Sequence, residues 1–312
     1  MAASDEIGSL ARAFSGIGVD EKTMISILGR LHPNERQSFR KGSRDLFVED
    51  ERQFERWNDR HILRLQHEFL RLKDAIVVWT MHPWERDGRL VKRALEEVPF
   101  QADILIEVAC SRSSDELLGA RRAYHSLTDR SIEEDVAFRI HGPEKKLLVA
   151  LVSAYRYEGP RVDEEAARAE AKSLSDIHKQ LGLQIDNEEV IRILSTRSKL
   201  HLQAIHKHYK EITAGNNLDE DVDGYLKQTV ECLCTPHKYF AKVLNASLDP
   251  SGHEEKKQGL TRITATRADV DMKQIKQEYH DKYGEDLSTK VAQVANGNYR
   301  DFILTLINAR ES

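Results

Sequence analysis

The stretch AFSGIGVDE at residues 13–21 combines residue types that could bind a ligand. Two glycines flank an isoleucine, and the acidic pair Asp20 and Glu21 follows before an apolar helical pattern begins. Three interpretations suit such a loop: a phosphate cradle, a metal site, or only the turn that leads into a helix.

The phosphate interpretation lacks its essential parts. A dinucleotide fingerprint needs a third glycine after a strand, and a P-loop needs a Gly-Lys-Ser/Thr ending. Here only G-x-G is present, after a helical segment. A helix-entry turn, with Asp20 as N-cap and Glu21 favouring the helix dipole, does not explain two glycines. Calcium binding explains them, because glycines let a loop curl its carbonyl oxygens around an ion that takes six to eight oxygen ligands.

The elements that must position this loop follow an internal repeat. An Arg is followed by an apolar residue at +5, Ala or Ile at +8 and Tyr at +12, offsets that share one face of a helix. The pattern occurs at Arg112/Leu117/Ala120/Tyr124, Arg197/Leu202/Ile205/Tyr209 and Arg267/Met272/Ile275/Tyr279, with a weaker copy near Arg30.

Each copy lies between apolar helical segments, and strand signals are nearly absent. We therefore predict an all-α protein of four units with about five helices each. Joins rich in Pro, Gly or charge place the units at residues 1–84, 85–159, 160–249 and 250–312.

Composition narrows the function classes. Of the 312 residues, 32% are charged and 7% aromatic, which suits a soluble helical protein. No apolar run could span a bilayer, and the N-terminus does not resemble a secretory signal. Three cysteines indicate a reduced, cytosolic chain. The net charge of −5 argues against broad nucleic-acid binding, and anionic lipid repels the chain unless a cation bridges the two.

Four segments resemble the annexins, especially their plant branch: SRSSDELLGARRAYH, LLVALVSAYRYEG, VIRILSTRS and LTRITATRADVDMKQIKQEY. The resemblance covers essentially the whole chain. It implies four five-helix repeats in a curved disc, whose convex face binds membranes through calcium.

The resemblance also implies a ligand set in the first repeat. By position, the carbonyls of Phe14, Gly16 and Gly18 would bind Ca²⁺, and an acidic side chain later in the chain would close the site. Glu68 is the candidate; a match without gaps, counted back from Trp79, places His67 there instead, and a shift of one residue restores Glu68. Ile17, at the loop tip, is expected to be exposed and to insert between lipid headgroups.

The equivalent loops of the other repeats depart from the family pattern. The second keeps only Gly88 among basic residues, and the third keeps Gly182 with its acids displaced. The fourth keeps Gly252, but Val294 falls where the closing acid belongs. We expect full calcium binding only in the first repeat, which leaves low-affinity or calcium-independent binding open.

Two other motifs suggest metal sites less strongly. DEDVDG at residues 219–224 begins like an EF-hand, but position 12 is Val230 rather than Glu, so we expect a solvated helix-capping loop. The histidines of HLQAIHKHYK lack the i,i+4 spacing of a metal pair, and we expect them in a surface or interface role. They are His201, His206 and His208.

Further residues carry redox and actin hypotheses. Cys232 and Cys234 are too close for a relaxed disulfide, and Cys110 is expected to be a small buried hydrophobe, although the resemblance associates its position with a proposed redox role. The histidine tied to peroxidase-type activity in plant annexins has no counterpart, since its place lies around Arg44. The Ile-Arg-Ile run at residues 191–193 matches a suggested actin motif, but its isoleucines also fit a helix core face.

The sequence thus predicts a cytoplasmic, peripheral protein that binds anionic phospholipid with calcium, and not an enzyme, since no nucleophile–His arrangement stands out. A second hypothesis is a calcium-independent scaffold for F-actin or a partner annexin. A third is an ion-conducting assembly, because annexins have a polar channel lined by Arg–acid pairs. Its candidates are Arg112, Glu116 and Arg267, for which structural ion pairing is the alternative role.

Overall fold

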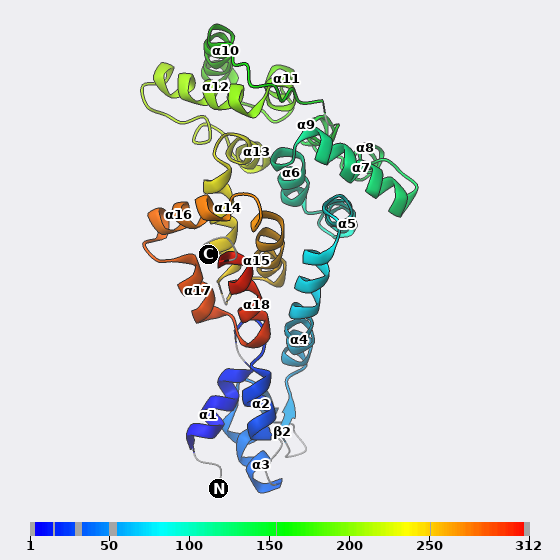
Figure 1. The fold of residues 1–312 in the computed structure, drawn as a ribbon, viewed down its shortest axis with the longest axis vertical. Coiled ribbons are helices and arrows are strands. Elements are labelled where there is room, and N and C mark those ends of the chain that lie inside the picture. The colour runs from blue at the N-terminus through cyan, green and yellow to red at the C-terminus, as the bar shows by residue number, and fades with distance from the viewer. Residues whose placement is uncertain are drawn as a thin grey trace. The chain divides into compact units, whose positions relative to one another are not determined.

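The computed structural model describes residues 4–14, 16–28, 33–49, 55–153, 155–249 and 251–308 (Figure 1). These residues form 18 helices and one two-stranded sheet, which confirms the predicted all-α class. The chain divides into two compact units. Unit 1 combines Met1–Thr80 with Ala241–Ser312, and unit 2 is Met81–Phe240.

Unit 1 contains the first and the last part of the chain. Helix α14 (Pro236–Ser247) crosses its boundary at residue 241. The other elements of unit 1 are α1 (Ser4–Ala13), α2 (Glu21–Leu28), α3 (Pro33–Gly42), β1 (Phe47–Glu49), β2 (Glu55–Trp57), α4 (Asp59–Thr80), α15 (Glu254–Arg267), α16 (Met272–Tyr283), α17 (Leu287–Val294) and α18 (Gly297–Asn308). Within the unit, α4 packs against α15 and α18.

Helix α4 is longer than the repeat pattern suggests. The sequence indicates a separate closing helix at residues 74–80, whereas the structure shows one helix of 22 residues. Its sequence contains neither Gly nor Pro from Asp59 to Thr80, so nothing in it breaks the helix.

A short hairpin was not expected from the sequence. Strands β1 and β2 pair antiparallel, with Phe47 opposite Trp57. Their rings lie 4.3 Å apart, so the hairpin is joined by an aromatic cross-strand pair. The sequence signals are weak here because each strand has only three residues.

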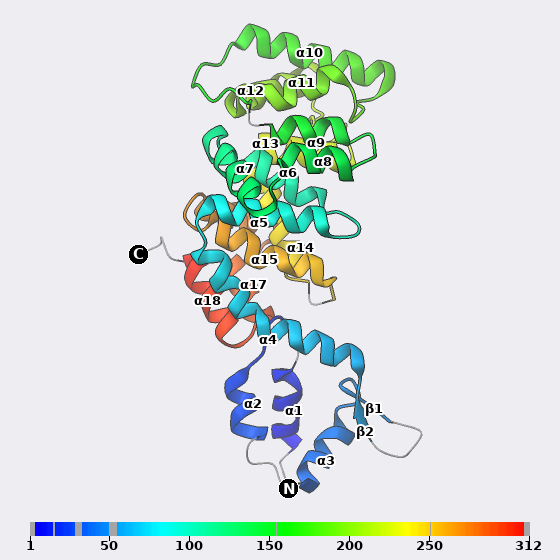
Figure 2. The ribbon, with the colours of Figure 1, turned by 90° about the vertical axis from the view of Figure 1, so that its right-hand side faces the viewer.

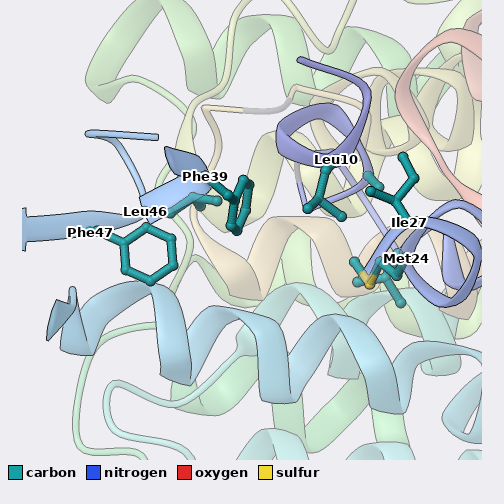
Figure 3. Close-up of a cluster of buried hydrophobic side chains, with 8 residues drawn as sticks. Leu10, Met24, Ile27, Phe39, Leu46 and Phe47 are labelled. Carbon is teal, nitrogen blue, oxygen red and sulfur yellow. The ribbon is translucent and has the colours of Figure 1, made fainter. Parts of the chain in front are cut away.

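The first hydrophobic cluster of unit 1 joins α1, α2, α3 and β1 (Figure 3). Apolar residues on one face of each short helix point into it, as amphipathic patterning requires. Its buried members are Leu10, Ala13, Val19, Met24, Ile27, Phe39, Leu46 and Phe47.

Unit 2 contains nine further helices among its described residues, and in it α5 packs along α7 and α10 along α12 (Figure 2). Helix α5 begins at Pro83, so the repeat boundary predicted at 84/85 falls inside it. The elements are α5 (Pro83–Glu96), α6 (Ala102–Ser111), α7 (Ser114–Thr128), α8 (Ile132–Arg139), α9 (Lys145–Val152), α10 (Glu164–Leu181), α11 (Glu188–Thr196), α12 (Lys199–Ile212) and α13 (Gly224–Cys234).

The Arg-to-Tyr repeat has a clear structural meaning. All nine of its +5, +8 and +12 side chains are buried, so each copy is the core face of a helix. Each Arg stands at the end of the preceding helix and pairs with a carboxylate. The pairs are Arg112 with Asp87, Arg197 with Glu170, and Arg267 with Asp271.

The candidate cation site of the first repeat

The glycine loop connects α1 to α2 in unit 1 and lies against the segment between α17 and α18. The Ile17 N–H donates to the Val294 carbonyl at 3.0 Å, and the Asn296 N–H donates to the Ile17 carbonyl at 2.8 Å. Ile17 is 0% exposed. The expectation of an exposed, lipid-inserting Ile17 is therefore wrong, because its backbone and side chain are already used within unit 1.

This packing explains both glycines. Gly16 and Gly18 have φ values of +88° and +80°, a region that L-residues with a Cβ rarely adopt. A Cβ on Gly16 would lie 2.9 Å from the Val294 carbonyl oxygen, and one on Gly18 would lie 2.9 Å from the Asn296 carbonyl oxygen. The glycines thus permit a close approach of two backbones, a role that the sequence does not reveal.

The loop ends at a helix N-terminus, as predicted. The carboxylate of Asp20 accepts the Thr23 N–H at 3.1 Å and the Thr23 hydroxyl at 2.7 Å. The Thr23 hydroxyl is the first cause of a pKa for Asp20 below its ordinary value. Asp20 is therefore the N-cap of α2, and its oxygens are directed at Thr23.

Glu68 reaches the loop from α4. The Gly18 N–H donates to Glu68 Oε2 at 2.6 Å across 50 residues of sequence, and Glu68 is only 3% exposed. His67, the other candidate for this position, is exposed. The structure thus brings Gly18 and Glu68 together, while Phe14 packs its ring against Phe39 and Trp57. Carbonyl ligation by Phe14 and Gly18 stays a prediction.

Both oxygens of Glu68 also face Arg71, one turn along α4. The Arg71 Nε donates to Oε2, and its Nη2 lies 3.0 Å from Oε1. The same Nη2 lies 2.6 Å from Oε1 of Glu254, at the start of α15. Burial alone would lower the pKa of Arg71, but its bonds to Glu68 and the attraction of Glu254 raise it above its ordinary value. Arg71 is a permanent cation between two carboxylates.

Two more cationic side chains complete the cluster. Arg64 Nη2 donates to the Gly16 carbonyl at 3.1 Å, so this predicted calcium ligand already binds a guanidinium. Lys257 is 6% exposed, and burial, followed by repulsion from Arg64, lowers its pKa. We call Arg64, Glu68, Arg71, Glu254 and Lys257 the loop charge cluster.

The chemistry of this donor set fits a cation. Glu68 and the Gly16 carbonyl are oxygen donors of the kind calcium prefers, and guanidinium groups already stand against both. No group of three or more His, Cys, Asp or Glu side chains suited to a metal occurs in the described part of the chain. Calcium at this loop would therefore depend on Glu68 and on backbone oxygens, and Arg64 and Arg71 would have to leave them.

The sequence analysis did not identify Arg64, Arg71 or Glu254 as residues of this site. Arg64, Glu68 and Arg71 follow an i, i+4, i+7 spacing and therefore share one helix face, a signal present in the sequence. Glu254 carries no such signal, because it lies 183 residues from Arg71.

The other repeats place their glycines differently. Gly88 lies inside α5, where a Cβ would stand 3.0 Å from the Tyr124 nitrogen, so it serves helix packing. Gly182 has φ +73° at the end of α10 and lines a cavity of about 620 Å³ with Asp221 and Asp223. The Val294 carbonyl binds Ile17, as described above.

Two of the three histidines of α12 are buried, and His206 is partly exposed. His201 and His208 are each 6% exposed. The ring of His201 contacts Glu170 at 3.0 Å, and that of His208 contacts Glu164 at 2.8 Å. The predicted surface or interface role is therefore wrong for these two, since acidic partners on α10 allow them to be buried.

The EF-hand-like segment is a helix entry, but it is only partly solvated. Asp223 stands at the N-cap position of α13. Asp219 is 3% exposed and contacts His206 at 3.2 Å and Lys238 at 3.0 Å. The segment leads into a helix as predicted, but Asp223 makes no side-chain cap hydrogen bond, and the prediction of a solvated loop is wrong at Asp219.

The remaining candidate residues have structural partners. All three cysteines are buried and free, which confirms the expectation for Cys110 and excludes a 232–234 disulfide. Arg112 donates to both oxygens of Asp87, at 2.5 and 2.8 Å. Glu116 closes a capping box with Ser113. Ile193 is 0% exposed, as expected for a core face.

Within the described residues, no helix combines the length and the apolar character that a membrane crossing requires.

Comparisons with known proteins agree with the fold. The annexin family model matches residues 86–151, 170–235 and 239–306. Annexin D4 of Arabidopsis thaliana is 47% identical over 316 residues, with 99% of each chain covered. Among solved structures, annexin III has a TM-score of 0.69 at 22% identity, covering 98% of this chain and 94% of its own. Calcium-bound annexin (Sm)1 has a TM-score of 0.66 at 20% identity, covering 98% and 90%. Because the family model matches more than half of the chain and Annexin D4 matches 99% of it, the chain belongs to the annexin family.

Proposed function

We propose that this protein binds anionic phospholipid membranes as a peripheral, calcium-dependent protein of the cytoplasm, with a binding rather than a catalytic role. Annexins in general bind phospholipids with calcium, and the family membership supports the coarse assignment. The contact that carries the finer proposal is the 2.6 Å bond from the Gly18 N–H to Glu68, because it joins the glycine loop to the predicted closing carboxylate.

Charge explains the need for a cation. The chain carries a net charge of −5, so an anionic leaflet repels it at long range. Bound calcium would supply positive charge with coordination positions left for lipid phosphate oxygens. The chain itself contributes Glu68 and the Gly16 carbonyl.

The calcium affinity of the site depends on how easily these oxygens become free. Arg64 must release the Gly16 carbonyl, and Arg71 must release Glu68, before either oxygen can serve as a ligand. Breaking charge-assisted hydrogen bonds costs free energy, so the proposal includes a weak calcium affinity in the first repeat. Repeats two to four are proposed to contribute little.

The test is sedimentation with liposomes across a calcium titration. Wild-type protein should sediment with phosphatidylserine-containing vesicles as calcium rises and should stay in solution with chelator or with neutral vesicles. Glu68→Gln should abolish the calcium-dependent fraction. Glu188→Gln is the matched control, because the Glu188 side chain is 92% exposed and lies in unit 2.

If Glu68→Gln sediments like wild type, the first-repeat site is refuted. Calcium-independent sedimentation with F-actin or with a partner annexin, without a lipid effect, would favour the scaffold hypothesis instead. Conductance in planar bilayers that charge reversal at Arg112 abolishes would favour the ion-conducting assembly.

A further inference from the structure

One guanidinium in unit 1 is shared between two carboxylates from distant parts of the chain. Arg71 bonds Glu68 on its own helix and Glu254 on α15. The Glu68 and Arg71 side chains are 2% and 6% exposed, whereas that of Glu254 is 35% exposed. The two carboxylates therefore differ, since only the buried one, Glu68, accepts a hydrogen bond from the glycine loop.

The hydrogen-bond pattern leaves Glu68 without a spare oxygen. Its Oε2 accepts from the Gly18 N–H and from Arg71 Nε, and its Oε1 accepts from Arg71 Nη2. A carboxylate has about four lone-pair sites, and these three bonds occupy three of them, two through Arg71. Arg71 must therefore withdraw before both oxygens of Glu68 can face a cation.

Glu254 offers Arg71 a second position. Its Oε1 lies 2.6 Å from Arg71 Nη2, closer than the 3.0 Å from that nitrogen to Glu68 Oε1. A guanidinium has five N–H donors, so Arg71 can give up Glu68 and keep Glu254. Leaving a buried charge wholly unpaired is strongly destabilising, and Glu254 removes that obstacle.

We propose that Arg71 is a tethered cation that competes with calcium for Glu68, and that Glu254 holds Arg71 once it has withdrawn. The proposal rests on the proposed function, because it assigns a regulation to the same site. Arg71 keeps the loop charge-balanced without metal, and Glu254 sets how readily Glu68 becomes free. Arg71 thus lowers the calcium affinity, and Glu254 raises it.

The test is that substitutions of Arg71 and of Glu254 should change the calcium affinity in opposite directions. Calcium binding is measured by isothermal titration calorimetry without lipid, and thermal unfolding is followed in chelator. Arg71→Gln should tighten calcium binding by about tenfold, and Glu254→Gln should weaken it by about threefold to tenfold. In the double variant the effect of Glu254→Gln should vanish, because its partner is gone. Arg89→Gln, which alters an exposed pair on α5, is the control and should change nothing.

A purely structural role for Arg71 gives a different result. Arg71→Gln would then lower the unfolding temperature and leave calcium affinity unchanged or weaker, which overturns the proposal. If Arg71→Gln does not fold, Glu254→Gln alone tests the proposal. An unchanged or tighter calcium affinity in Glu254→Gln would refute the proposed role of Glu254. Loss of calcium heat in Glu68→Gln would meanwhile keep the proposed first-repeat site intact, whereas unaltered heat in that variant would refute that site.

Discussion

Asn296 donates its backbone N–H to the carbonyl of Ile17 at 2.8 Å, and Ile17 returns a bond to Val294. A loop near the start of the chain is thereby fixed to a loop near its end, as an isolated parallel bridge between Ile17 and Ala295. The glycine loop is a packed element of unit 1 as well as a candidate ligand site.

Substitution of Gly18 should destabilise unit 1 more than positive φ alone explains. Gly18→Ala combines φ +80° with a Cβ 2.9 Å from the Asn296 oxygen, whereas Gly284→Ala combines φ +71° with open space. Strain should cost each variant about 1 kcal/mol, and the clash should add about 1–3 kcal/mol to Gly18→Ala only. Urea unfolding measures the free energy of unfolding of both variants. Equal losses of this free energy would contradict the close packing of the loop.

Substitution of two apolar residues, Ile17 and Leu181, should have very different effects on stability. Ile17, in the glycine loop, is 0% exposed, whereas Leu181, the last residue of α10, is 76% exposed. Ile17→Ala should cost about 2–5 kcal/mol of unfolding free energy, and Leu181→Ala less than about 0.5 kcal/mol. The same urea titration compares them. A loss as small for Ile17→Ala as for Leu181→Ala would contradict the buried position of the Ile17 side chain.

Acid should weaken unit 2 through Glu170. Burial alone would raise its pKa, but hydrogen bonds from Arg197, Arg192 and His201 hold the pKa of this carboxyl below its ordinary value. A lowered folded-state pKa stabilises the fold above the ordinary pKa, and this stabilisation is lost as pH falls through the folded-state value.

Glu170→Gln should therefore unfold at a lower temperature than wild type near pH 7. The difference between the two unfolding temperatures should become smaller between about pH 5 and pH 3. Thermal unfolding followed by circular dichroism across this range gives the comparison, with Glu188→Gln as the exposed control. A difference in unfolding temperature that does not change with pH would show that the charge of Glu170 does not contribute to the stability of the fold.

Local periodicity made most of the fold predictable. The Arg-to-Tyr pattern identified Leu117, Ile205 and Tyr279 as core because helix faces are encoded within a few residues, and the annexin resemblance is confirmed by the family matches. The full length of α4 was not predicted, although its sequence has no helix breaker. The hairpin of Phe47 and Trp57 was not predicted either, because three-residue strands carry almost no pattern.

The candidate site was predictable only in part. The closing carboxylate, Glu68, was named correctly as the residue that meets the loop, and its calcium ligation stays a prediction. The contacts of Ile17 with Val294 and of Arg71 with Glu254 were not predicted, because they join residues far apart in sequence. Such pairings depend on tertiary packing, which short-range spacing does not encode.

The composition of unit 1 has a consequence for biosynthesis. Its N-terminal part, Met1–Thr80, meets its C-terminal part only after all of unit 2 has been made. At a synthesis rate of about 5–20 residues per second, Ile17 waits roughly 15–55 s for Val294 to be made. Unit 2 is complete once Phe240 has been made, which is before Val294, so we expect its core to form first and the two parts of unit 1 to assemble last.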